Sequence, residues 1–107
     1  MEPVDILKAA RELIELPAGW SQGAYARDWT GRAVGLLQPQ ACQFCSVGAV
    51  ARIAGSDRTF SLSTTGAMSA LMDAMSGDIP RFNDSHTHEE VLAAFDKAID
   101  ALSHASD

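Results

Sequence analysis

Residues 39–54 of this chain read PQACQFCSVGAVARIA and are apolar over almost their whole length. The polar side chains in the stretch are Gln40, Gln43, Ser46 and Arg52. Pro39 suits the first turn of a helix, and Gly55 suits its C-terminal cap. A helix that is apolar on nearly every side belongs in the centre of a domain. We therefore predict a buried central helix over 39–54, around which the other elements must pack.

Two cysteines lie in this stretch with the C-x-x-C spacing that zinc sites and redox centres use, namely Cys42 and Cys45. A zinc site needs two further ligands, and only His86 and His88 have a suggestive spacing. A redox motif sits at the start of a helix that follows a strand, whereas the pattern predicts both cysteines a turn or more inside a helix. We therefore expect two packed core residues, with no metal and no cofactor.

Helical patterns extend over two further parts of the chain. Residues 3–16 begin with a proline in the first turn and carry one apolar stripe. Residues 65–76 carry a methionine-rich stripe, for which Ser63 or Thr64 would provide the N-cap. Residues 78–84, DIPRFND, predict a tight and ordered linker between this helix and the last one.

The last helix has the clearest start signal in the sequence. Thr87 and Glu90 form a T-x-x-E capping box ahead of a helix that we predict over 88–104. Residues 20–37 instead change to a period of two, and a turn-like DWTG cluster at 28–31 divides them. This part of the chain therefore predicts a short β-hairpin.

The order of these elements predicts an α+β fold in a single domain that spans residues 1–107. It is mostly helical, with an N-terminal helix, a short β-hairpin, the buried central helix and two further helices. A chain of 107 residues is long enough for one hydrophobic core, because folding at this size buries roughly 65% of the surface of the extended chain. Such a core needs no disulfide or metal to hold it together.

The net charge of −6 limits the classes of partner. Nucleic acids and anionic membranes bind clustered lysines and arginines, and this sequence has only isolated ones. The first residues, MEPVDILKAA, are acidic, and no apolar run is long enough to span a bilayer. We therefore expect a cytoplasmic protein with reduced cysteines, whose partner is another protein rather than a nucleic acid or a membrane.

Cys45 is also a candidate nucleophile, with His86 or His88 as the base and Asp84 as the group that orients the base. The residue types are present, but the sequence predicts no strand after Cys45 of the kind that usually presents the base. The histidines are explained more simply as part of a solvated turn ahead of the last helix. We assign no catalytic residue and favour a protein that is not an enzyme.

Three ordered blocks, GWSQGAYARDWTG, CSVGAV and FND, precede the amphipathic last helix. They resemble an uncharacterised family of small bacterial and phage proteins, whose blocks read W-x-Q-G-A-Y-A-R-D, C-x-x-G-A and [WF]-N-D. The matching positions are Trp20, Gln22, Ala24, Arg27, Gly31, Cys45, Gly48, Ala49, Asn83 and Asp84. The resemblance covers about residues 6–102 and leaves Cys42 outside the pattern. It implies no mechanism, because the family carries no established activity.

The first and last blocks supply the candidate ligand-binding residues. If the hairpin packs beside the start of the last helix, apolar walls and a few polar groups converge there, as in small-ligand sites. The candidates are Trp20, Gln22, Tyr25, Arg27, Asn83 and Asp84. The competing interpretation is structural. In it, Asn83 and Asp84 hold a turn, and Arg27 forms an ion pair with Asp84 that joins the two halves of the fold.

Two functions remain open from the sequence. The favoured one is a non-catalytic interaction or regulatory module that binds another protein through an acidic surface, with Trp29 as a candidate contact. The alternative is a small-molecule-binding or Cys/His-dependent hydrolytic domain that uses the hairpin and the Asn83-Asp84 turn. A solvent-open cleft beside Asn83, with Cys45 within hydrogen-bond reach of a histidine, would favour the alternative.

Overall fold

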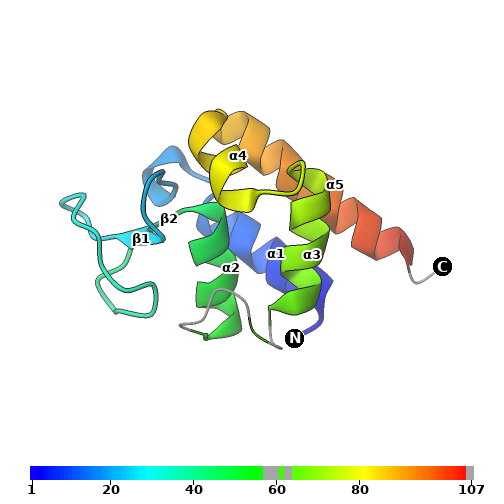
Figure 1. Cartoon of the computed structure of the whole chain (residues 1–107). Coiled ribbons are helices and arrows are strands. Elements are labelled where there is room, and N and C mark those ends of the chain that lie inside the picture. The colour runs from blue at the N-terminus through cyan, green and yellow to red at the C-terminus, as the bar shows by residue number, and fades with distance from the viewer. Residues whose placement is uncertain (57–60, 62–63, 106–107) are drawn as a thin grey trace.

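The computed structural model describes residues 1–56, 61 and 64–105 of the chain. Figure 1 shows a mostly helical molecule with one two-stranded antiparallel sheet, which confirms the predicted α+β class. In chain order the elements are α1 (Pro3–Leu13), the 3-10 turn η1 (Pro17–Gly19), β1 (Ala26–Arg27), β2 (Gln43–Phe44), α2 (Ser46–Ala54), α3 (Thr65–Ala74), α4 (Ile79–Ser85) and α5 (His88–Ala105).

The hydrophobic core lies among the helices. Helix α1 packs against α2, α3 and α5, and α3 packs against α5. Each of these helices buries one apolar stripe, because side chains three and four positions apart share a helix face. Large side chains that are fully buried there include Leu7, Val50, Met68, Leu71, Val91 and Phe95. Burying each such side chain contributes about 1.5–3 kcal/mol, so this packing is the main stabilisation of the fold.

The central helix is shorter than the sequence predicts. It begins at Ser46 rather than near residue 39, and Cys45 is its N-cap with an extended backbone (φ −78°, ψ 175°). Residues 39–45 instead form turns and strand β2, so the expectation that both cysteines lie inside the helix is wrong. Cys45 is buried, but Cys42 is exposed. The predicted end of the helix is confirmed, since Gly55 is a left-handed C-cap with φ 72°.

The predicted hairpin has a different partner strand. Ala26 pairs with Phe44, and Arg27 pairs with Gln43, so β1 lies beside β2 rather than beside a strand over 33–37. The turn at 28–31 is present, but the expected return strand is reduced to one isolated bridge between Arg27 and Ala33. Strand β1 thus pairs with β2 on one side and with Ala33 alone on the other. We call residues 20–44 the loop segment, which Figure 1 shows running from blue through cyan to green, with its cyan part at the side opposite the C-terminus.

The C-terminal part contains one more helix than the sequence predicts. Residues 79–85, expected as a linker, form α4, whose N-cap Asp78 accepts a hydrogen bond from the Arg81 N–H at 3.1 Å. The predicted capping box of α5 is confirmed, because the Thr87 and Glu90 side chains each accept from the other residue's backbone N–H, at 3.1 and 2.9 Å. Within the described ranges, no helix is long and apolar enough to cross a membrane.

Helix α3 begins close to its predicted position. Thr64 is the N-cap residue, although its hydroxyl oxygen accepts from the Ser61 N–H at 2.9 Å rather than from the helix itself. Ser63, the other predicted cap, lies outside the described residues. The helix ends at Ala74, and Gly77 follows with φ 93°, a backbone conformation that favours glycine. The chain can therefore turn sharply from α3 into α4.

Candidate functional site

Asn83 on α4 is the centre of a buried hydrogen-bond network. Its side chain has no exposed surface. The amide oxygen Oδ1 accepts from Trp20 Nε1 at 2.9 Å, from the Ser46 backbone N–H at 3.0 Å and from Ser46 Oγ at 2.7 Å. The amide nitrogen Nδ2 donates to the Ser21 carbonyl at 3.0 Å. Asn83 therefore joins three parts of the fold, namely the start of the loop segment, the start of α2 and the body of α4.

The next residues of the loop segment also bond to α4. Gln22 Nε2 donates to the carbonyl oxygens of Asn83 and His86, at 3.0 and 3.2 Å. The Gly23 N–H donates to Asp84 Oδ1 at 3.1 Å. The last carbonyls of a helix lack partners within the helix, so the Gln22 amide satisfies groups that would otherwise need water. Four of the six predicted site residues thus fasten the loop segment to α4, namely Trp20, Gln22, Asn83 and Asp84.

Arg27 has a different role from the one that the sequence suggested. Its guanidinium donates to the carbonyl oxygens of Gly31 and Gln22, each at 3.0 Å. No ion pair joins Arg27 to Asp84 among the described residues. The predicted pair is therefore wrong. Arg27 instead braces the loop segment from within, because it bridges backbone carbonyls on both sides of β1.

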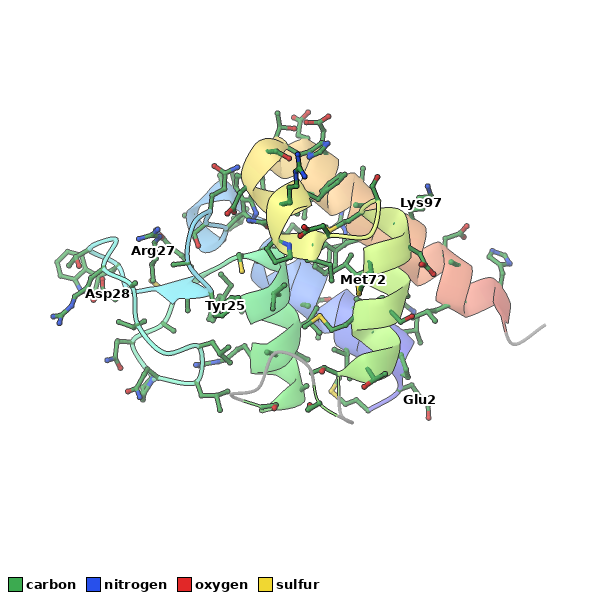
Figure 2. The ribbon with its side chains drawn as sticks, in the orientation of Figure 1. Glu2, Tyr25, Arg27, Asp28, Met72 and Lys97 are labelled. Atoms are coloured by element: carbon green, nitrogen blue, oxygen red, sulfur yellow. The ribbon has the colours of Figure 1, made fainter. Side chains whose placement is uncertain are left out.

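A pocket of about 370 Å³ lies between the loop segment and the two helices α2 and α4. Its lining residues are Gly23, Ala24, Tyr25, Cys45, Pro80 and Asp84. Tyr25 and Asp84 are thus the predicted site residues that line it. Figure 2 shows Tyr25 beside α2, and it shows Arg27 and Asp28 farther out along the loop segment. The pocket is open to solvent and includes Cys45, but no histidine lines it, so it meets only part of the condition stated for the alternative function.

The thiol of Cys45 faces this pocket in its neutral form. Burial raises the pKa of the Cys45 thiol above its ordinary value, and the nearby Asp84 carboxylate raises the pKa further. The Gly48 N–H donates to Sγ at 3.3 Å, which opposes the rise without cancelling it. A thiol that remains protonated at neutral pH is a poor nucleophile.

Neither candidate base reaches the Cys45 thiol. The His86 ring stacks on Phe82 with centroids 3.6 Å apart, and His88 Nε2 lies 2.6 Å from the Ile14 carbonyl oxygen. Neither histidine lines the pocket. Within the part of the chain that the structure describes, no group of three histidine, cysteine or acidic side chains could hold a metal ion. The described residues therefore do not bring Cys45 together with the histidine that the hydrolytic alternative needs.

Gly48 allows the loop segment to lie directly on α2. A Cβ atom added at Gly48 would lie 1.9 Å from the carbonyl oxygen of Tyr25, so no other residue fits there without a shift of the backbone. Sequence reasoning missed the network role of Ser46 and the wall formed by Pro80. The signal for Ser46 was its polar side chain in an otherwise apolar stretch.

The turn that follows β1 exposes large side chains on an ordered backbone. Asp28 Oδ1 accepts from the Thr30 N–H at 2.9 Å, from Thr30 Oγ1 at 2.6 Å and from the Arg32 N–H at 3.1 Å. The hydrogen bond from the Thr30 hydroxyl is the main reason why the Asp28 pKa lies below its ordinary value. Trp29, between these residues, is 83% exposed. Such a held turn presents its tryptophan to solvent in a defined position.

The far end of the loop segment is held in a similar way. Arg52 Nη1 on α2 donates to the carbonyl oxygens of Leu36 and Gln38, at 2.9 and 2.8 Å. The same guanidinium lies over the ring of Phe44, 5.7 Å from its centroid. Both ends of the loop segment are therefore fixed to helices by polar side chains.

The fold and this site define a small α+β domain in which one polar network fixes a long loop segment beside a pocket. Residues 1–101 match the model of a family described as a family of unknown function (DUF6197), and the chain belongs to that family. No curated protein and no solved structure matches the chain. The resemblance to an uncharacterised family is thus confirmed.

Proposed function

We propose that this domain is a non-catalytic interaction module that presents the turn around Trp29 to an acidic, partly apolar segment of a partner protein. The observation that carries the proposal is the 83% exposure of Trp29 on a turn whose backbone is held by the Asp28 carboxylate. Tryptophan is among the residues that contribute most to protein interfaces, and an ordered turn loses little conformational freedom on binding.

The loop segment carries two other exposed large apolar side chains. Tyr25 is 50% exposed and Leu37 is 42% exposed, and both belong to the loop segment. Together with Trp29 they are three of the exposed large apolar side chains of the described residues, the others being Met1 and Leu16. Tyr25 and Leu37 thus offer further apolar contacts on the loop segment, and aromatic side chains are enriched at protein interfaces.

The charge of the loop segment supports an acidic partner. The loop segment carries two arginines, Arg27 and Arg32, and a single acidic residue, Asp28, whose carboxylate is used within the turn. The rest of the chain holds thirteen of the fourteen acidic side chains and six of the eight lysines and arginines. An acidic partner would be attracted to the loop segment and repelled by the remaining surface. We therefore propose that the partner contacts the turn around Trp29, rather than the acidic surface that the sequence analysis favoured.

One observation supports a binding role without catalysis, and another supports a location in the cytoplasm. The Cys45 thiol has a raised pKa, and the residues that line its pocket include no histidine. Cys42 is an exposed free thiol, which suits a reducing compartment. Regulation of the partner is the role that we propose for such a module.

A random peptide display selection against the immobilised full-length protein tests the proposal. We expect the selected peptides to combine Asp or Glu with apolar residues. Trp29→Ala should weaken their binding by about 2 kcal/mol or more, which is roughly 30-fold in Kd, because it removes the central contact. Arg32→Ala should weaken binding by a smaller factor that disappears at high salt.

Leu16→Ala is the matched control, because Leu16 is 71% exposed and lies outside the loop segment. It should bind the selected peptides as the unaltered protein does. Selection of basic peptides, or equal binding by Trp29→Ala, would contradict the proposal. Concentration-dependent self-association that Trp29→Ala abolishes would also overturn it, since the partner would then be a second copy of this chain.

A further inference from the structure

We propose that the pocket beside Cys45 binds a small organic cation, that is, an ammonium or guanidinium group on an apolar body. This site is independent of the Trp29 turn. It is lined by Gly23, Ala24, Tyr25, Cys45, Pro80 and Asp84, from the loop segment, the start of α2 and helix α4. Its volume of about 370 Å³ lies within the range of small-molecule sites, roughly 300–1,000 Å³.

Asp84 supplies the group that would recognise a cation. Its Oδ1 atom accepts from the Gly23 N–H and from Asn83 Nδ2, both at 3.1 Å, so the carboxylate is held in one orientation. Oδ2 has no hydrogen bond or ion pair with any of the described residues. A fixed carboxylate with one open oxygen is suited to a charge-assisted hydrogen bond from a ligand N–H.

No positive side chain of the described residues neutralises this carboxylate. Arg27 is the positive side chain that the sequence suggested as the partner of Asp84. Its guanidinium instead donates to the carbonyl oxygens of Gln22 and Gly31. The Cys45 thiol remains neutral because burial raises its pKa. Asp84 is thus the one charged side chain among the residues that line the pocket, and its charge attracts cations and repels carboxylates and phosphates.

The remaining walls suit the apolar body of such a ligand. Ala24 and Pro80 offer aliphatic surface, and the half-exposed ring of Tyr25 offers an aromatic one. The face of an aromatic ring attracts a nearby cation, which adds to the attraction of the carboxylate. An aromatic or aliphatic amine therefore fits the pocket better than a bare inorganic cation.

The test uses three probes of similar shape and different charge, namely benzylamine, benzyl alcohol and benzoate. Each is titrated into the full-length protein while backbone amide chemical shifts are recorded by NMR. We expect benzylamine to shift the amides of Gly23, Ala24, Cys45 and Asp84 with an apparent Kd at least about tenfold below that of the alcohol. Equal binding of the alcohol, or binding of benzoate at these amides, would overturn the proposal without any variant.

Asp84→Asn sharpens the test, because its amide oxygen can still accept from the Gly23 N–H. This variant should lose at least about tenfold in benzylamine affinity. Asp73→Asn removes the same charge from an exposed position on α3 and should bind benzylamine normally. Trp29→Ala should also bind it normally, which separates this site from the proposed protein contact. Equal weakening by the Asp73 and Asp84 variants would reduce the effect to net charge and overturn the proposal.

A capped lysine, Nα-acetyl-lysine methylamide, identifies the source of the cation. It should bind more weakly than benzylamine, because its flexible chain loses more conformational freedom in the pocket. Tighter binding of the capped lysine would assign the pocket to a protein side chain and would contradict a small-molecule ligand.

Discussion

The helices α1, α3 and α5 and the loop segment belong to one small fold, but different interactions hold them in place. The helices bury large apolar side chains, including Leu7, Met68, Leu71, Val91 and Phe95. The buried apolar side chains of the loop segment are Ala26, Leu36, Ala41 and Phe44. Hydrogen bonds from polar side chains also hold the loop segment in place. The residues that form them are Asn83, Arg27, Arg52 and Asp28.

The helices thus provide most of the stability of the fold, whereas the loop segment carries the surfaces that we propose for binding. A helical core tolerates little change in shape, and its buried side chains cannot contact other molecules. A loop fixed by hydrogen bonds can be equally ordered while its own side chains remain free to contact other molecules. Trp29 and the pocket beside Asp84 both depend on this second kind of order. The Asn83 network is therefore the part of the fold on which the proposed binding should depend most.

The largest effect on stability should come from the helical core. Phe95→Ala should lower the free energy of unfolding by about 3–5 kcal/mol, because it removes a fully buried ring and leaves a cavity. Urea denaturation measures the loss. Leu102→Ala, at a partly buried position of the same helix, should cost less. A smaller loss for Phe95→Ala than for Leu102→Ala would show that the core does not centre on these helices.

The Asn83 network should come next. Asn83→Ala should destabilise the protein by about 2–3 kcal/mol, since it leaves the Ser46 N–H and the Trp20 Nε1 without an acceptor. Ser46→Ala removes only one donor of the network and should cost about 1 kcal/mol. Both losses are measured by urea denaturation. Equal losses for the two variants would mean that Asn83 does not act as the common acceptor.

The helices could be predicted from the sequence because their signals are local. The apolar stripe of α1, the capping box at Thr87 and Glu90, and the C-cap at Gly55 all lie within a few residues of what they determine. Helix α4 was missed although Asp78 and Pro80 are suitable start residues. Its length of seven residues leaves no room for a recognisable apolar period.

The pairing of the strands could not be predicted, because it depends on distant contacts. A short apolar run such as 41–45 suits a buried strand and a buried helix equally well. The choice is made by the carbonyls of Tyr25 and Arg27, which accept from the N–H groups of Cys45 and Cys42. Hydrogen bonds join four of the six candidate residues at α4, namely Trp20, Gln22, Asn83 and Asp84, whereas Arg27 lies farther out along the loop segment. Their division into network, brace and pocket depends on side-chain directions that no sequence pattern carries.

The two thiols differ in exposure between the loop segment and its junction with α2. Cys42 is exposed at the surface of the loop segment, whereas Cys45 is 5% exposed at its junction with α2. An alkylating reagent at neutral pH should therefore label Cys42 roughly a hundredfold faster than Cys45, because Cys45 reacts only after local opening. Mass spectrometry of Cys42→Ser and Cys45→Ser follows each thiol separately. Comparable rates would indicate that the junction is open.

The smallest effect should be the response of the Trp29 turn to acid. The pKa of Asp28 is lowered from its ordinary value of 3.8 by the Thr30 hydroxyl. The carboxylate thus stabilises the turn fully above pH 3.8, and this stabilisation is lost as the pH falls through the lower pKa of the folded state. The amide shifts of Thr30 and Arg32 should report that midpoint. A midpoint at or above the ordinary value would contradict the hydrogen-bonded turn.

Native-state hydrogen exchange tests most directly whether the Asn83 network holds the loop segment. The informative amides are those of Val34 and Cys42, which donate to the carbonyls of Ala26 and Arg27. In Asn83→Ala we predict that these two amides lose protection, whereas in Phe95→Ala they keep it, because the loop segment opens while the helical core remains packed. A loss of protection at these two amides in Phe95→Ala as large as that at the amides of α1 and α5 would contradict this division of the fold.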